Sequence, residues 1–100
     1  MNSTETKLPD LQNTLLDERL LETLLRDIAS CTDIFEIIPK LAAGYVGQGS
    51  VSLDEGRALL LSRQVRALQI RYHYQGAQWW DTIMVVGQQF RLVRIQHNFG

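Results

Sequence analysis

A glycine-rich segment is the first part of this 100-residue chain whose residues could do chemistry. Gly44, Gly47 and Gly49 precede a predicted helix, and the backbone N–H groups at a helix N-terminus can bind phosphate. The spacing fits neither common phosphate-binding pattern. Ser50 stands where the P-loop needs its lysine, and the dinucleotide pattern needs its middle glycine one residue earlier. The segment is therefore predicted to be a connecting loop.

Residues that could bind a metal ion or act as a nucleophile are few and far apart. His73 and His97 are expected on one face of a sheet but on its first and third strands, roughly 9–10 Å apart, whereas ligand atoms lie within about 2 Å of a metal ion. Cys31, the single cysteine, has no base beside it in the sequence. Arginines near Asp81 are expected to lower the pKa of its carboxyl, which suits an ion pair better than a general base. We therefore predict no catalytic residue, no metal site and no cofactor.

The most distinctive side chains are arginines and aromatic residues that alternate near the C-terminus. Residues 71–74 read RYHY, and residues 79–81 read WWD. Successive side chains of a strand point to opposite faces, so one tryptophan is expected on a face that the helices do not cover; Trp80 is preferred and Trp79 is the alternative. Tryptophan, tyrosine and arginine are enriched in binding hot spots. The candidate partner-binding residues are Arg71, His73, Trp80, Arg91 and Arg94.

Two segments are predicted to be helices. Leucines at i, i+4 spacing predict an amphipathic helix from about residue 15 to about residue 31, with Thr14 as its N-cap. A capping-box sequence at residues 52–55 predicts a second helix over about 53–62. Gly56 is expected to weaken this second helix by about 1 kcal/mol relative to alanine.

Residues 33–43, between these helices, stay open to two interpretations. A helix can restart at Thr32 or Asp33, and Pro39 would then kink or end it, because proline disfavours helical backbone in the residue before it. A short strand over residues 34–38 is the alternative. The apolar pattern alone does not decide between them.

After Gln64 the apolar residues recur every second position, which predicts strands. The predicted strands are residues 68–74, 78–86 and 90–97. Short turns containing Gly76 and Gly87 separate them, so the three strands form a meander. The predicted fold is α+β, with two or three N-terminal helices packed on a C-terminal three-stranded antiparallel β-meander.

Turn length sets the register of this meander. Two-residue turns place Ile70 and Arg94 opposite Asp81, and Asp81 and Arg94 then form an ion pair at the margin of the helix-packed face. A three-residue first turn would pair Arg71 with Asp81 instead. The register therefore decides which arginines share a face with which aromatic rings.

Composition limits the class of protein. The chain is 45% hydrophobic and 21% charged, which suits a globular domain; we expect it to span residues 10–100 after a flexible tail at residues 1–9. No apolar run approaches the ~18 residues of a membrane span, so no membrane association is predicted. A single cysteine and a polar N-terminus favour a cytoplasmic location.

Charge is divided along the chain, although its formal net value is only −1. Residues 1–56 carry ten acids and four bases, whereas residues 57–100 carry six arginines and one acid. Either the two parts neutralise each other within the fold, or one exposed face attracts an oppositely charged partner.

These patterns predict a non-enzymatic protein-interaction domain, an accessory or adaptor protein that binds through the arginine and aromatic residues of its meander. The partner is another protein or a second copy, because a three-stranded sheet leaves two edges to protect. A nucleic-acid-binding domain using the same face is the alternative, since arginines and aromatic rings on an antiparallel sheet can hold phosphates and stack bases. A weaker idea is a small-molecule pocket between the leucine-rich helix and the sheet.

Overall fold

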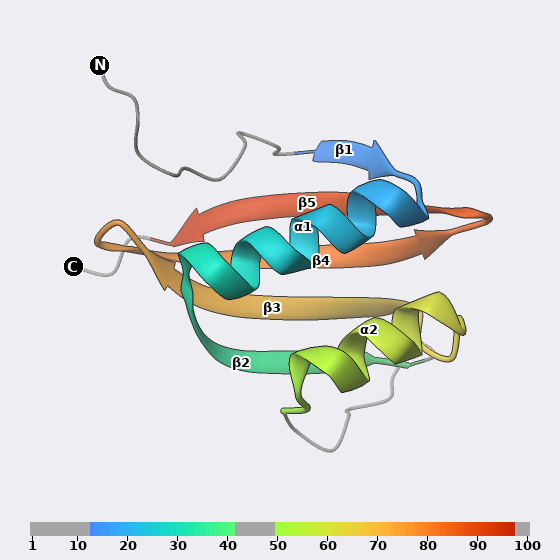
Figure 1. Cartoon of the computed structure of the whole chain (residues 1–100), viewed down its shortest axis with the longest axis horizontal. Helices are drawn as coiled ribbons and strands as arrows, with labels where there is room; N and C mark the ends of the chain where they lie inside the picture. The colour runs from blue at the N-terminus through green and yellow to red at the C-terminus, as the bar shows by residue number, and fades with distance from the viewer. Residues whose placement is uncertain (1–12, 42–49, 98–100) are drawn as a thin grey trace.

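Five strands form a single antiparallel sheet in the computed structural model, which describes residues 13–41 and 50–97. The elements are β1 (Asn13–Leu16), α1 (Glu18–Cys31), β2 (Asp33–Lys40), α2 (Leu53–Leu61), β3 (Ala67–Tyr74), β4 (Ala77–Val86) and β5 (Gln89–His97). The strand order is β1-β5-β4-β3-β2. Both helices lie on the same face of the sheet, in front of it in Figure 1.

The predicted meander of three strands under two or three helices is wrong in its element count. The structure is α+β, but residues 13–41 and 50–97 form two helices, and β1 and β2 extend the meander on both sides. β5 pairs with β1 and β3 pairs with β2, so neither outer strand of the meander is an edge of the sheet. The predicted tail and the glycine-rich loop lie outside the described residues.

The segment left open by the sequence is the strand β2. Its register places Ile37 opposite Ile70 on β3, which buries Ile37 in the core. The backbone of Ile37 faces away from β3, because its N–H donates to Ser50 Oγ and its carbonyl accepts from Val51 N–H. By alternation Pro39 also turns its backbone nitrogen to this outer side, where a missing N–H costs no ladder hydrogen bond.

The other unpredicted strand, β1, takes up residues assigned to the start of the first helix. Helix α1 begins at Glu18, and its N-cap is Asp17 rather than Thr14: an Asp17 carboxylate oxygen accepts from Leu20 N–H at 2.8 Å. Leu16 still reaches the core, with 2% of its surface exposed, but from a strand paired with β5. The predicted end of this helix near residue 31 is confirmed.

Helix α2 confirms the capping-box prediction. The Ser52 hydroxyl accepts from Glu55 N–H at 3.0 Å, and the Glu55 carboxylate accepts from Ser52 N–H at 2.9 Å. Gly56 is buried against β3, where an added Cβ would lie 2.8 Å from a methyl group of Leu68. The glycine therefore permits the close approach of helix and sheet. This packing compensates for the low helix propensity of glycine.

The register of the meander is confirmed. Ile70 and Arg94 both lie opposite Asp81, and both turns have two residues. Gln75 and Gly76 have φ of 50° and 78°, the two positive values that suit a tight hairpin turn with right-handed strand twist. The helices pack on one face of these strands, whose buried side chains are Leu68, Ile70, Tyr72, Asp81, Ile83, Phe90, Leu92 and Arg94. We call this the covered face.

Candidate functional site

The opposite side of the sheet, here called the open face, has no described helix over it (Figure 1). Alternation along β3, β4 and β5 gives it the side chains Ala67, Gln69, Arg71, His73, Gln78, Trp80, Thr82, Met84, Val86, Gln89, Arg91, Val93, Ile95 and His97. Strands β1 and β2 add Asn13, Leu15, Asp33, Phe35, Glu36, Ile38 and Lys40.

Most of the exposed large hydrophobic side chains lie on the open face. Five large hydrophobic residues are exposed in the part of the chain that is described, and four of them lie here: Leu15, Phe35, Val86 and Ile95. Ile95 is the most exposed of the four, at 52%. The fifth, Leu20, lies on α1. An uncovered apolar surface of this kind commonly marks a binding site.

Trp80 occupies the middle of the open face and is ordered by its neighbours. The guanidinium carbon of Arg71 lies 3.7 Å from the centre of the Trp80 ring, and the His97 ring centre lies 4.0 Å from it. The indole N–H donates to Gln78 Oε1 at 2.9 Å. The ring is therefore half-buried by polar neighbours, although it lies outside the core.

Arg71 is itself held in place by groups of two strands. Its Nη1 donates to Glu36 Oε1 at 3.1 Å across the sheet, and its Nε donates to Gln69 Oε1 at 2.9 Å along β3. A guanidinium fixed over an indole ring gains a cation–π attraction and loses little entropy when a partner binds. The Arg71–Trp80 pair is thus a prearranged contact.

Phe35 and His73 add a second ring pair beside this one. A register shift between Ile34 and Glu36 makes Phe35 a bulge residue, and its ring stacks on that of His73 with centres 4.7 Å apart. Both residues are exposed. Phe35 and Glu36 were not predicted as site residues, because the local pattern of their segment fits either a helix or a strand. Leu15 was not predicted either, because its leucine spacing favours a helix.

The structure gathers only part of the predicted site. Arg71, His73 and Trp80 lie together, whereas Arg91 is on the same face but nearer the β4–β5 turn, where its Nη1 donates to Asn13 Oδ1 at 2.9 Å. Arg94 is on the covered face and is buried, with 7% of its surface exposed. Ile95, its neighbour in sequence, is the β5 residue that stands opposite Trp80.

Arg94 belongs to a buried cluster with Asp81 and Tyr72. Its Nη2 and Nε donate to the two Asp81 carboxylate oxygens at 2.7 and 2.9 Å, and the Tyr72 hydroxyl donates to Asp81 Oδ1 at 3.0 Å. The predicted ion pair is confirmed, but it is enclosed rather than marginal: Asp81 has 0% of its surface exposed.

The pKa values of this cluster follow from its burial. Burial raises the pKa of Asp81, and the hydrogen bonds from Arg94 and Tyr72 only partly oppose it, so the expected lowering by nearby arginines is wrong. Burial also raises the pKa of the Tyr72 hydroxyl, with a further contribution from the Asp81 charge. A carboxylate enclosed in this way and bonded on both oxygens is a structural group.

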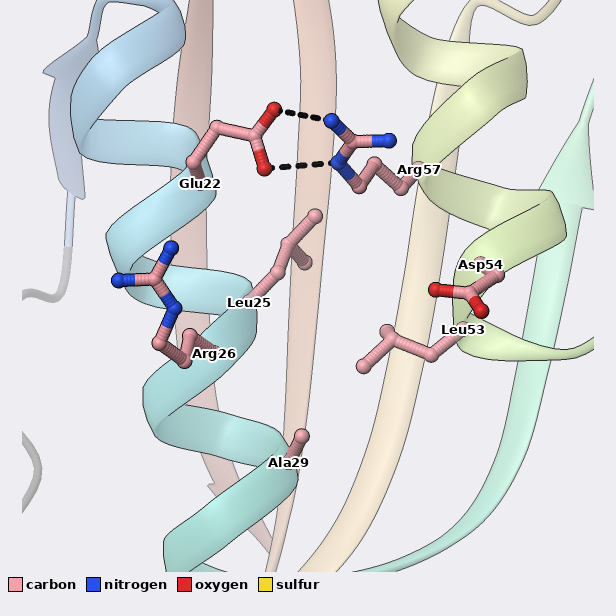
Figure 2. A pocket seen from close by; sticks show the side chains of 7 residues that line it. All are labelled: Glu22, Leu25, Arg26, Ala29, Leu53, Asp54 and Arg57. Atoms are coloured by element: carbon pink, nitrogen blue, oxygen red, sulfur yellow. Dashed lines mark hydrogen bonds and ion pairs between the residues drawn. The ribbon is translucent and has the colours of Figure 1, made fainter.

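A groove with a volume of about 340 Å³ lies between the two helices. Figure 2 shows Leu25 and Leu53 facing each other in it, below the Glu22 carboxylate, which accepts from Arg57 Nε and Nη2 at 2.7 and 2.6 Å. Arg57 lowers the pKa of this carboxyl. The ion pair ties α1 to α2 across the mouth of the groove.

Within residues 13–41 and 50–97, no three His, Cys, Asp or Glu side chains are grouped closely enough to hold a metal ion. Neither described helix is long and apolar enough to cross a lipid bilayer. Comparison of the chain with protein-family models, curated proteins and solved structures found no match.

Proposed function

We propose that this chain is a non-enzymatic interaction domain, an accessory or adaptor protein that binds a partner protein through its open face. The observation that carries the proposal is the placement of four exposed large hydrophobic residues on that one face. The Arg71–Trp80 pair among them has the residue types that dominate protein interfaces. A cytoplasmic location is part of the proposal and rests on the single cysteine.

The charges of the open face favour a protein over a nucleic acid. Glu36 already pairs with Arg71, and Asp33 is a further acid on the same surface. A phosphate backbone needs uncompensated positive charge, and each nearby carboxylate opposes it. Stacking of bases on Trp80 and Phe35 is the basis of the alternative, nucleic-acid-binding function.

The test compares one substitution on each side of the molecule. Ile95→Glu places a charge in the open face, and Leu20→Glu is its matched control, since the two aliphatic side chains are 52% and 50% exposed. Each tagged variant is used for affinity capture from the native lysate, with and without nuclease. We expect a set of proteins that survives nuclease and is retained by wild type and Leu20→Glu but lost by Ile95→Glu.

Two other outcomes contradict the proposal. Captured material that disappears after nuclease treatment would favour the nucleic-acid function. Binding that Ile95→Glu leaves unchanged would exclude the open face as the surface used.

A further inference from the structure

We infer that the occupant of the open face is a second copy of this chain, bound face to face about a two-fold axis. The inference rests on the proposed function, because it uses the same surface and names the partner. Sheets that pack face to face lie about 10 Å apart with their strands within about 30° of each other. The two copies would thus form a sandwich with both helix layers outside.

The size of the open face suits such a dimer. Strands β2 to β5 have eight to ten residues each. At ~3.3 Å per residue and ~4.8 Å between strands, four strands of this length cover roughly 600 Å². Two such faces in contact bury roughly 1,200 Å², which lies at the lower end of specific protein interfaces.

Polar and apolar groups are distributed on the open face as in an interface. The central strand β4 contributes only uncharged side chains to it: Gln78, Trp80, Thr82, Met84 and Val86. Three of the five charged side chains, Asp33, Glu36 and Lys40, come from the edge strand β2. The guanidinium near the centre, that of Arg71, is paired with Glu36 of β2. Depletion of unpaired charge from the centre is typical of a protein interface.

The rim charges are arranged so that the face complements itself. Asp33 and Glu36 lie in the first half of β2, and Lys40 is its last residue. A two-fold axis that crosses the strands at right angles lays β2 over β2 of the other copy in the opposite direction. Asp33 of one copy then lies over Lys40 of the other, and this contact occurs twice, as two-fold symmetry requires.

Pairing through the edge of β2, the alternative way to join two copies, is opposed by its backbone. The outward N–H and carbonyl of Ile37 are already bonded to Ser50 and Val51, Pro39 has no N–H to offer, and Phe35 forms a bulge. Each of these features protects an edge strand from pairing with another strand. The edge of β2 therefore gives no reason to expect a homodimer, and the inference rests on the open face instead.

The test is sedimentation equilibrium of the purified 100-residue chain over a range of concentrations. We expect a monomer–dimer equilibrium for wild type, weakened roughly tenfold or more by Ile95→Glu and unchanged by Leu20→Glu. Urea unfolding of both variants checks that they are folded. The direction of the two-fold axis is tested by reversing charges on β2. Lys40→Asp should weaken the dimer, and the double variant Asp33→Lys with Lys40→Asp should restore it.

Failure of this inference can be told apart from failure of the proposed function. A chain that is monomeric at every concentration overturns the second-copy inference, while lysate capture that depends on Ile95 still supports an interaction domain. A dimer that Leu20→Glu disrupts and Ile95→Glu does not also overturns the inference, because the helix side would then form the contact.

Discussion

Two clusters of the same chemistry lie back to back in the sheet. The buried cluster joins Arg94, Asp81 and Tyr72 on the covered face, and the open cluster joins Arg71, Glu36 and Trp80 on the other. Each contains an arginine, an acid and an aromatic ring. They differ in solvent: Asp81 and the Arg94 side chain are at most 4% exposed, whereas the side chains of Arg71 and Glu36 are 24% and 36% exposed.

This difference in burial assigns different roles to similar residues. A buried ion pair that loses one member leaves the other as an uncompensated charge. Replacing either member therefore destabilises the fold, which restricts the pair to a structural role. An ion pair open to solvent contributes little to stability, because water can replace either member. The open cluster is thus free to serve binding, whereas the buried cluster joins three strands within the core.

Removing the buried acid should give the largest effect. Asp81→Ala should lower the free energy of unfolding by about 3–5 kcal/mol, because Arg94 then remains buried without its carboxylate. Urea denaturation measures it. The double replacement Asp81→Leu with Arg94→Met is the control, and it should cost far less, because no buried charge remains. An equally large loss in the double variant would show that shape, not charge, is what the cluster supplies.

Crowding the covered face should have the next largest effect. Gly56→Val should lower the free energy of unfolding by about 1–3 kcal/mol, because its side chain meets Leu68 on β3. Thermal and urea unfolding measure the change. Gly76→Ala tests a different cause, since that glycine has open space around it and a φ of +78°. A stabilised Gly56→Val variant would show that α2 does not pack closely on the sheet.

Removal of the open-face tryptophan should cost less stability than either change on the covered face. Trp80→Ala should lower the free energy of unfolding by about 1 kcal/mol, because the ring is partly solvated and its cation–π contact with Arg71 is worth roughly 0.5–1 kcal/mol. Urea denaturation measures it beside Asp81→Ala. A loss of about 3–5 kcal/mol, as for a core aromatic residue, would mean that the open face is not open at Trp80.

The smallest effect should appear in the pH dependence of the exposed acids. Arg57 lowers the pKa of Glu22 from its ordinary 4.5, so the folded state releases this proton more readily than the unfolded state does. The stability that Glu22 adds is therefore present above pH 4.5 and is lost as the pH falls through its lowered pKa. Wild type should exceed Glu22→Gln in unfolding free energy at pH 7, and the difference should vanish in acid.

A difference between wild type and Glu22→Gln that grew in acid would contradict the sign given for Glu22.

Local signals account for what could be predicted. The capping box at Ser52 and Glu55 and the two-residue turns at Gly76 and Gly87 involve residues within a few positions of each other. Turn length then determined the pairing of Asp81 with Arg94 without any further information. The candidate site was predicted in part for the same reason, since alternation placed Arg71, His73 and Trp80 on one face.

The sequence by itself determined helix α2, the end of α1 and the three meander strands, and it limited their register to the two alternatives set by the length of the first turn. Only the tertiary structure decided that residues 13–16 form a strand, because their partners at 90–93 lie far away in the chain. The tertiary structure also decided that residues 33–40 form a strand. Their local pattern fits a helix or a strand, and pairing with β3 selects the strand. The tertiary structure also decided which side chains are buried. Arg94 is enclosed and Ile95 is exposed because the helices cover the face on which Arg94 lies.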